Sequence, residues 1–217
     1  AILSVVVLYW KKFFNFKRWE FYVKLIIAVI PALIFGKLFS EKIDDLLESP
    51  LFIAVIMLVG GIFFLFVDNI FKNPEIKNEN EVSPITALKI GLFQCLAILL
   101  PGLSRSAATI IGGMSLKLTR NAAAEFSFFL AVPTMLAVTT YSVFLKHWHL
   151  ATGDKKGYEM ITESSQHMMI FAIGNVVAFI VAVLAIKGFV GVLKLYGFKP
   201  FGWYRIIVGL LILFLLR

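Results

Sequence analysis

The sequence predicts an all-α integral membrane protein with about five or six membrane-spanning helices and a re-entrant helical hairpin. Hydrophobic residues make up 60% of its 217 residues and charged residues only 16%, and the mean hydropathy is +0.90. A soluble domain has about 45–50% apolar and about 25% charged residues. Apolar segments long enough to cross a bilayer also recur along the chain. We therefore expect a single polytopic domain over residues 1–217, in contact with membrane lipids.

The charge distribution fits the same class of protein. The formal net charge is +8, from 21 Lys and Arg residues against 13 Asp and Glu residues. In a membrane protein this excess marks the loops on the inner side, so we expect no nucleic-acid partner. Cys95 is the only cysteine, which excludes an internal disulfide and favours a small, buried apolar side chain.

The first segment, residues 1–10, is apolar but too short to span a bilayer. It ends in the interfacial aromatic residues Tyr9 and Trp10, and a basic cluster follows at residues 11–18. This pattern is typical of the end of a span followed by an inner loop. We expect the chain to continue a longer protein whose first hairpin lies upstream of Ala1.

The next elements alternate between apolar spans and polar loops. A span is predicted at Phe21–Phe39, with a kink at Pro31, and a second span at Leu51–Val67, which carries no charge. The stretch Ser40–Pro50 between them is acidic, as an outer loop can be. Its carboxylates could bind a divalent cation, but a solvated turn is favoured. Phe71–Pro84 is polar and predicts an inner loop.

The stretch from Ile85 to Leu118 predicts a hairpin that enters the membrane and returns to the same side. Its uncharged pieces, Ile90–Ser104 and Ser106–Leu116, are each shorter than a span. The segment Pro101-Gly102-Leu103-Ser104-Arg105-Ser106 separates them. Two half-helices that meet at a broken point fit this pattern better than one continuous span.

The rest of the chain completes the predicted bundle. Arg120 precedes a span at Phe126–Leu145, and Lys146–His167 is a polar outer loop. The chain then continues with a span at Met168–Ile186, a basic connection at Lys187–Lys199 and a short last helix at Trp203–Arg217. The basic clusters fall mostly on one side only if the hairpin is re-entrant, which supports that topology.

Arg105 is the strongest candidate for a functional residue in this sequence. A charge at the centre of a membrane helix costs about 2.5–3.5 kcal/mol on insertion scales, so it tends to face a cavity and to serve a function. Its planar guanidinium suits phosphate oxygens, and the N-terminus of the following helix would present backbone amides to the same anion. Ser104 or Ser106 can cap that helix, and Thr109 adds a hydroxyl. The alternative is that Arg105 binds a lipid headgroup or a carbonyl at the interface.

The motifs of this chain and their order resemble those of one known family. The stretch from Gln94 through Pro101-Gly102-Leu-Ser104-Arg105-Ser106-Ala-Ala-Thr109 is similar to the P-G-x-S-R-S-G-x-T motif of undecaprenyl pyrophosphate phosphatases. Residues 120–133 resemble the family segment that follows, and Pro200-Phe201 with Tyr204-Arg205-Ile206 resemble its C-terminal motif. The resemblance runs in order along essentially the whole chain.

The resemblance implies an activity, a location and a set of site residues. It implies interlocked inverted repeats, often assembled as a homodimer, in the bacterial inner membrane, with the active site facing the outer side. The implied reaction converts C55 polyprenyl diphosphate to the monophosphate, the lipid carrier of cell-wall synthesis, with Mg²⁺ or Ca²⁺ as cofactor. The implied catalytic residues are Arg105, Ser104 and Ser106. The implied substrate-binding residues are Pro101, Gly102, Thr109 and Gln94, although Gln94 alone is typical of an interhelical hydrogen bond.

Two departures from the family pattern affect these expectations. Ala107 stands where the motif usually has glycine, and the family's N-terminal motif E-x-x-x-E-F-L-P-x-S-S-T-G-H does not occur in the chain. We expect that motif upstream of Ala1, and therefore little or no turnover by these 217 residues alone. No metal ligand is assigned within them.

Other polar residues are weaker candidates for the missing groups. Ser164-Ser165-Gln166-His167 lacks the acidic residues of the motif, and Glu125 is better explained by packing or by a helix terminus. His147 and His149 could bind a metal, but an interfacial His-Trp-His turn is favoured.

Two other functions remain open from the sequence. A transporter or flippase of a phosphorylated lipid would also use broken helices at mid-membrane. A non-catalytic membrane scaffold would tolerate substitutions of Arg105, Ser104 and Ser106.

Overall fold

The structure is a computed structural model that describes residues 1–14, 19–39, 49–150 and 153–216. The predicted acidic loop therefore lies mostly outside the described residues. The chain forms two compact units, and each is described by itself. One comprises Ala1–Lys17 and Ala131–Gly188, and the other comprises Arg18–Leu130 and Phe189–Arg217.

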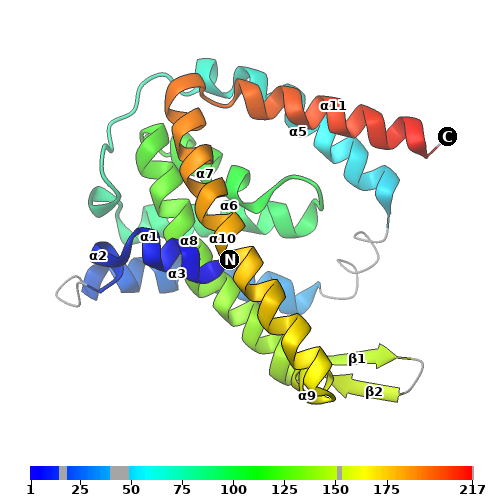
Figure 1. Cartoon of the computed structure of the whole chain (residues 1–217). Coiled ribbons are helices and arrows are strands. Elements are labelled where there is room, and N and C mark those ends of the chain that lie inside the picture. Colours follow the sequence, from blue (N-terminus) through cyan, green and yellow to red (C-terminus); the bar gives the residue numbers. More distant parts are fainter. Residues whose placement is uncertain (15–18, 40–48, 151–152, 217) are drawn as a thin grey trace. The chain divides into compact units, whose positions relative to one another are not determined.

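Helices dominate the described chain (Figure 1). They are α1 (Ile2–Leu8), α2 (Trp10–Phe13), α3 (Trp19–Leu38), α5 (Pro50–Ile70), α6 (Pro84–Leu99), α7 (Arg105–Ser115), α8 (Arg120–Thr140), α9 (Gly157–Thr162), α10 (Ser165–Tyr196) and α11 (Lys199–Leu215). A 3₁₀ turn at Glu79–Glu81 precedes α6, and a π-helical turn at Tyr141–Leu145 continues α8. Four described helices are long and apolar enough to cross a membrane: α3, α5, α8 with its π-helical turn, and α10. The predicted class of all-α membrane protein is confirmed.

The hairpin formed by α6 and α7 returns to the side from which it starts. The amides of Glu75 and Ile76, before α6, donate to the carbonyl of Lys117, after α7, at 2.8 and 2.9 Å. The amide of Thr119 donates back to the carbonyl of Ile76 at 2.8 Å, so that Ile76 and Leu118 form a short parallel bridge. Both ends of the hairpin therefore lie together, and its turn lies at the opposite end, as predicted.

Two close helix pairs hold this hairpin within its unit. Helix α6 packs against α3 where Gly91 meets the backbone of Ala28, and α5 packs against α11 where Gly61 meets the carbonyl of Gly202. A Cβ on Gly61 would lie 2.9 Å from that carbonyl oxygen. Small residues allow this backbone approach, which is how helices associate when lipid supplies no hydrophobic driving force.

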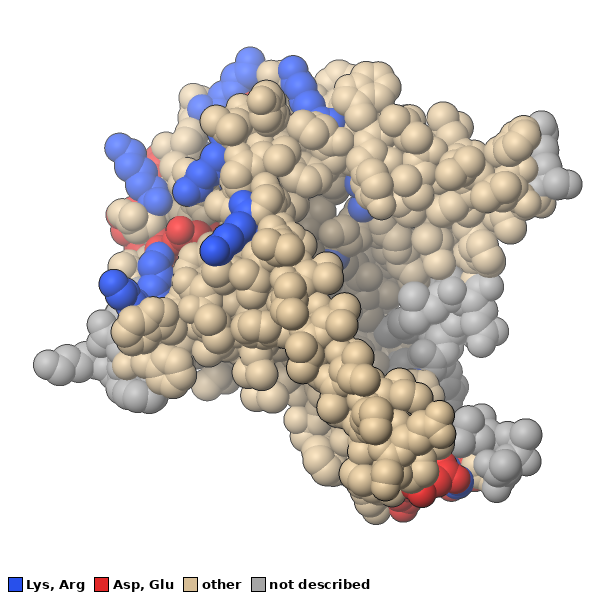
Figure 2. All heavy atoms as spheres, in the orientation of Figure 1, with Lys and Arg blue, Asp and Glu red and all other residues tan. Residues whose placement is uncertain are grey.

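Helix α10 is longer than the predicted span. It runs from Ser165 to Tyr196 and includes Lys187 and Lys194, which were expected in a loop. A helix accommodates lysines near the membrane surface because their side chains extend toward water. Gly197, whose φ is 70°, follows the last residue of α10. Between residues 168 and 186, the surface of α10 carries no charge (Figure 2).

The predicted polar loop at Lys146–His167 contains regular structure. Strands β1 (His147–Leu150) and β2 (Gly153–Lys156) pair antiparallel, with His147 opposite Lys156. Helix α9 follows, and Lys155 contacts Glu163 at 2.7 Å. This ion pair lowers the pKa of the Glu163 carboxyl. The His147-Trp148-His149 segment therefore lies on a strand, and the expected interfacial turn is wrong.

Candidate functional site

The turn between α6 and α7 has a backbone that few sequences can adopt. Gly102 has a φ of 97° and Ser104 a φ of 74°, and the amide of Leu103 closes the turn by donating to the carbonyl of Leu100 at 3.0 Å. A Cβ on Gly102 would lie 2.8 Å from the carbonyl oxygen of Ile53 in α5. Glycine is needed at this position both for its φ and for the close approach of α5.

The first turn of α7 leaves donors available at this point. The amide of Ala108 is the first that bonds to the preceding turn, donating to the carbonyl of Ser104 at 3.0 Å. The amides of Arg105, Ser106 and Ala107 have no backbone acceptor in the described part of the chain. Such free amides, with the positive end of the helix dipole, attract an anion.

The expectation that the Ser104 hydroxyl caps α7 is wrong. Ser104 occupies the N-cap position, but its side chain accepts no hydrogen bond from the helix. Its positive φ differs from the extended conformation from which a serine normally caps a helix. The hydroxyl of this exposed residue is thus not used by the helix.

Arg105 is a cation without a counter-charge within the described residues. It is only partly exposed, and its Nη1 atom is buried without a hydrogen-bond partner. No ion pair to Arg105 occurs in the described part of the chain. A buried cation of this kind is stabilised when an anion binds beside it.

The length of α7 places Arg105 deep in the hairpin. Its 11 residues correspond to about 16 Å of rise, which is about half of a hydrocarbon core of ~30 Å. The base of the hairpin carries the polar residues at 75–78 and 117–120, so an α7 that runs along the bilayer normal from a base at the membrane surface would bring the turn near the middle of the bilayer. Charge–charge interactions are stronger there than in water.

Arg205 is a functional candidate that the sequence analysis did not include among the site residues. Only 7% exposed, it lies on α11, and its Nη2 atom donates to the carbonyl of Gly102. Its guanidinium lies over the ring of Phe64, 5.0 Å from the centroid, and against Gly60, where an added Cβ would meet Nη2 at 3.0 Å. Arg205 thus links α11 to the turn between α6 and α7. The available signal was a charge inside an apolar helix whose only other charged residue is Lys199 at its start.

Two other predicted residues lie behind the turn rather than at its surface. Thr109 is 1% exposed, and its hydroxyl lies 2.6 Å from the hydroxyl of Ser127 on α8 and 3.0 Å from the carbonyl of Arg105. Gln94 is also 1% exposed. Their roles in substrate binding stay predictions, whereas the contacts of Thr109 show that it joins α7 to α8. Pro101 is buried.

The described residues do not fit a site for a divalent cation. No group of three or more His, Cys, Asp or Glu side chains gathers in the described part of the chain. Asp68 is engaged in an ion pair with Arg120 at 3.0 Å, and the Nδ1 atom of His167 lies 3.9 Å from Glu163. We therefore derive no step through a metal from these residues.

Comparisons with known proteins agree with the motif order. The family model of the bacitracin resistance protein BacA matches residues 1–211. An undecaprenyl-diphosphatase of Flavobacterium psychrophilum is 53% identical over 213 residues, covering 98% of this chain and 76% of that protein. One of Porphyromonas gingivalis is 50% identical over 232 aligned residues, covering 100% and 79%. One of Bdellovibrio bacteriovorus is 40% identical over 218, covering 100% and 77%. The family predicted from the motifs is confirmed, and the chain belongs to the bacitracin resistance protein BacA family.

Proposed function

We propose that this chain carries the diphosphate-binding part of an undecaprenyl-diphosphatase. In this reaction water attacks the terminal phosphorus of the lipid diphosphate, the bond to the bridging oxygen breaks, and the lipid monophosphate and phosphate are released. The observation that supports this most is Arg105, a partly buried guanidinium with an unpartnered Nη1 beside free helix amides. The relatives that match along the chain carry the same enzyme name.

Each group at the turn has a distinct task in this proposal. Arg105 binds the terminal phosphate and balances the charge that grows on its oxygens as the phosphorus–oxygen bond breaks. The amides of Ser106 and Ala107 bind a second oxygen, and the hydroxyls of Ser104 and Ser106 complete the cradle. Arg205 acts as a positioning residue, since its contact is with the carbonyl of Gly102 and not with the substrate.

Three further features are part of the proposal. A divalent cation, Mg²⁺ or Ca²⁺, would enter the site with the substrate and would offset the charge of the diphosphate, because Mg²⁺ in particular commonly binds to substrate phosphates and few protein ligands. The cradle faces the outer side of the bacterial inner membrane, because the basic clusters at residues 11–18 and 187–199 favour the inner side and the re-entrant hairpin starts from that side. A homodimer is the proposed assembly.

Two measurements test the assignment of Arg105. The affinity of this chain for a polyprenyl diphosphate is measured in nanodiscs, and phosphate release is measured for the complete protein that contains it. We expect Arg105→Ala to weaken binding strongly and to abolish release, whereas Lys199→Gln, an exposed cation on α11, leaves both unchanged. Wild-type binding and turnover in Arg105→Ala would remove the proposal.

A further inference from the structure

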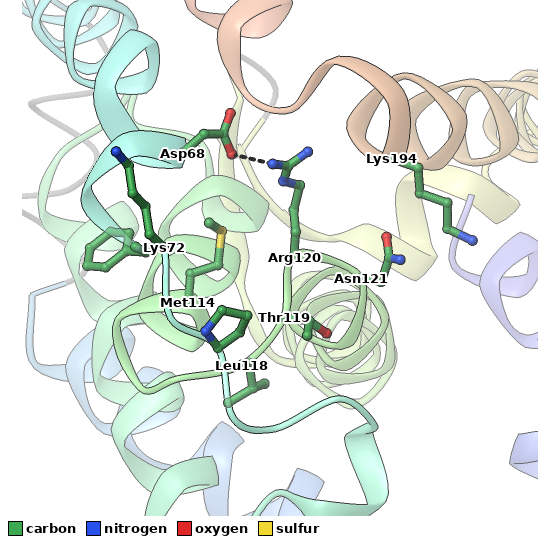
Figure 3. Close-up of a pocket in the computed structure, with 10 residues that line it drawn as sticks. Asp68, Lys72, Met114, Leu118, Thr119, Arg120, Asn121 and Lys194 are labelled. Carbon is green, nitrogen blue, oxygen red and sulfur yellow. Dashed lines mark ion pairs between the residues drawn. The ribbon is translucent and has the colours of Figure 1, made fainter.

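A polar cavity lies at the end of α7 opposite to Arg105, within the same compact unit. It has a volume of about 370 Å³. Its polar lining comes from the end of α5 and the segment after it, from the start of α8 and the residue before it, and from the last turn of α10 (Figure 3). The polar side chains are Asp68, Lys72, Thr119, Arg120, Asn121 and Lys194. Nothing in the proposed phosphatase reaction uses this cavity.

The acidic residue in the cavity is already engaged. Asp68 Oδ1 lies 3.0 Å from Nη2 of Arg120, and Asp68 Oδ2 accepts a hydrogen bond from the amide of Phe198 at 2.8 Å. The Nη1 atom of Arg120 donates to the carbonyl of Leu193 at 3.0 Å. One carboxylate oxygen therefore accepts a hydrogen bond, the other lies within ion-pair distance of Arg120, and the charges of Asp68 and Arg120 balance each other.

Two lysines remain as uncompensated charges on the cavity wall. Lys72 and Lys194 form no ion pair with any residue that the structure describes, and they lie on opposite sides of Arg120 (Figure 3). Asn121, at the start of α8, adds an exposed amide between Arg120 and Lys194. The cavity therefore has an excess of two positive charges, together with neutral hydrogen-bond donors.

We propose that this cavity binds a phosphate group, either the headgroup of an anionic phospholipid or inorganic phosphate. Its volume accommodates such a group, and the flexible stems of Lys72 and Lys194, on opposite sides of Arg120, would let their ammonium groups turn toward it. The cavity lies next to the bridge between Ile76 and Leu118, at the base of the hairpin. This end of the unit carries the basic loops, and anionic headgroups attract basic residues at a membrane surface. The site is distinct from Arg105, and its test needs no turnover.

The first experiment uses thermal unfolding of the chain in phosphatidylcholine nanodiscs. A ligand that binds only the folded protein raises the unfolding midpoint with its concentration. The probes are phosphatidic acid mixed into the nanodisc and inorganic phosphate in the buffer. The midpoint rises with phosphatidic acid alone if the site selects a lipid, and with both probes if it selects the phosphate group. A midpoint that responds to neither probe overturns the proposal.

The second experiment localises the effect to the cavity. Replacing Lys72 and Lys194 together by Gln is expected to raise the probe concentration needed for a given rise of the midpoint about tenfold or more. Lys199→Gln is the control outside the cavity. Asn121→Asp places a carboxylate in the cavity while favouring the first turn of α8. It is expected to reduce the response without lowering the midpoint in the absence of probe. An unchanged response in both the double variant and Asn121→Asp contradicts the proposal.

Discussion

Helix α7 separates two arginines that have opposite surroundings. Arg105, the first residue of α7, has a buried Nη1 without a partner and no ion pair among the described residues. Arg120, just beyond its last turn, is paired with Asp68 and bonded to the carbonyl of Leu193. A cation in an ion pair stabilises the folded chain, whereas the charge of an unpaired cation is available to bind an anionic ligand. Sequence alone gives both residues the same chemistry, and their neighbours determine their roles.

The largest effect is expected when lysine replaces each arginine in turn, because lysine has the same charge but not the planar guanidinium. Arg105→Lys keeps the charge but loses the planar pair of donors that suits a phosphate. We expect phosphate release by the complete protein to fall by about 10²–10³-fold, with an unchanged unfolding midpoint. The matched variant Arg120→Lys should show the reverse, with nearly normal release and a lower midpoint. Equal losses of release in the two variants would show that the comparison is wrong.

The next effect concerns stability. Arg120→Met leaves Asp68 without its cation in a partly buried position, where the two side chains are 32% and 15% exposed. We expect a loss of about 1–3 kcal/mol in the free energy of unfolding, which is less than for a fully buried pair. Adding Asp68→Leu should restore part of this loss, because no unpaired carboxylate remains. Additive losses in the double variant would show that the pair contributes little.

A third variant tests the shape of the turn at Arg105. Gly102→Ala would strain a φ of 97° and bring a Cβ to 2.8 Å from the carbonyl of Ile53. We expect a destabilisation of about 1–3 kcal/mol and weaker binding of the diphosphate. Gly174→Ala is the control, because an added Cβ there meets nothing within 4 Å. If the two variants behave alike, the turn is more tolerant than its geometry indicates.

The smallest expected effect separates a backbone role of Ser104 from a hydroxyl role. Ser104→Gly fits the φ of 74° without strain, and Ser104→Ala keeps the Cβ, so both variants lack only the hydroxyl as a ligand group. We expect about tenfold weaker diphosphate binding in both, with a higher unfolding midpoint for the glycine variant. Normal binding in both would restrict Ser104 to a backbone role.

The sequence predicted the hairpin because its two apolar pieces are short and a Pro-Gly break separates them. It did not predict the full length of α10, since lysines near a membrane surface are compatible with either a helix or a loop. The pair β1 and β2 was missed because residues 147–156 lack the alternation that marks a half-buried strand.

Within the site, the sequence identified the arginine and the turn but not what supports them. The contact between Arg205 and Gly102 joins residues 103 positions apart. Helical periodicity describes only near neighbours along one helix, so it cannot reveal such a contact. The partnership of Thr109 with Ser127 was hidden for the same reason.

The bridge between Ile76 and Leu118 has a consequence for motion. It consists of backbone hydrogen bonds. These bonds hold the two ends of the hairpin together independently of the side chains in the flanking loops. A rearrangement at the tip, residues 100–104, can therefore occur without separating the two arms of the hairpin at its base. Helix α7 cannot slide along α6 unless those backbone hydrogen bonds break.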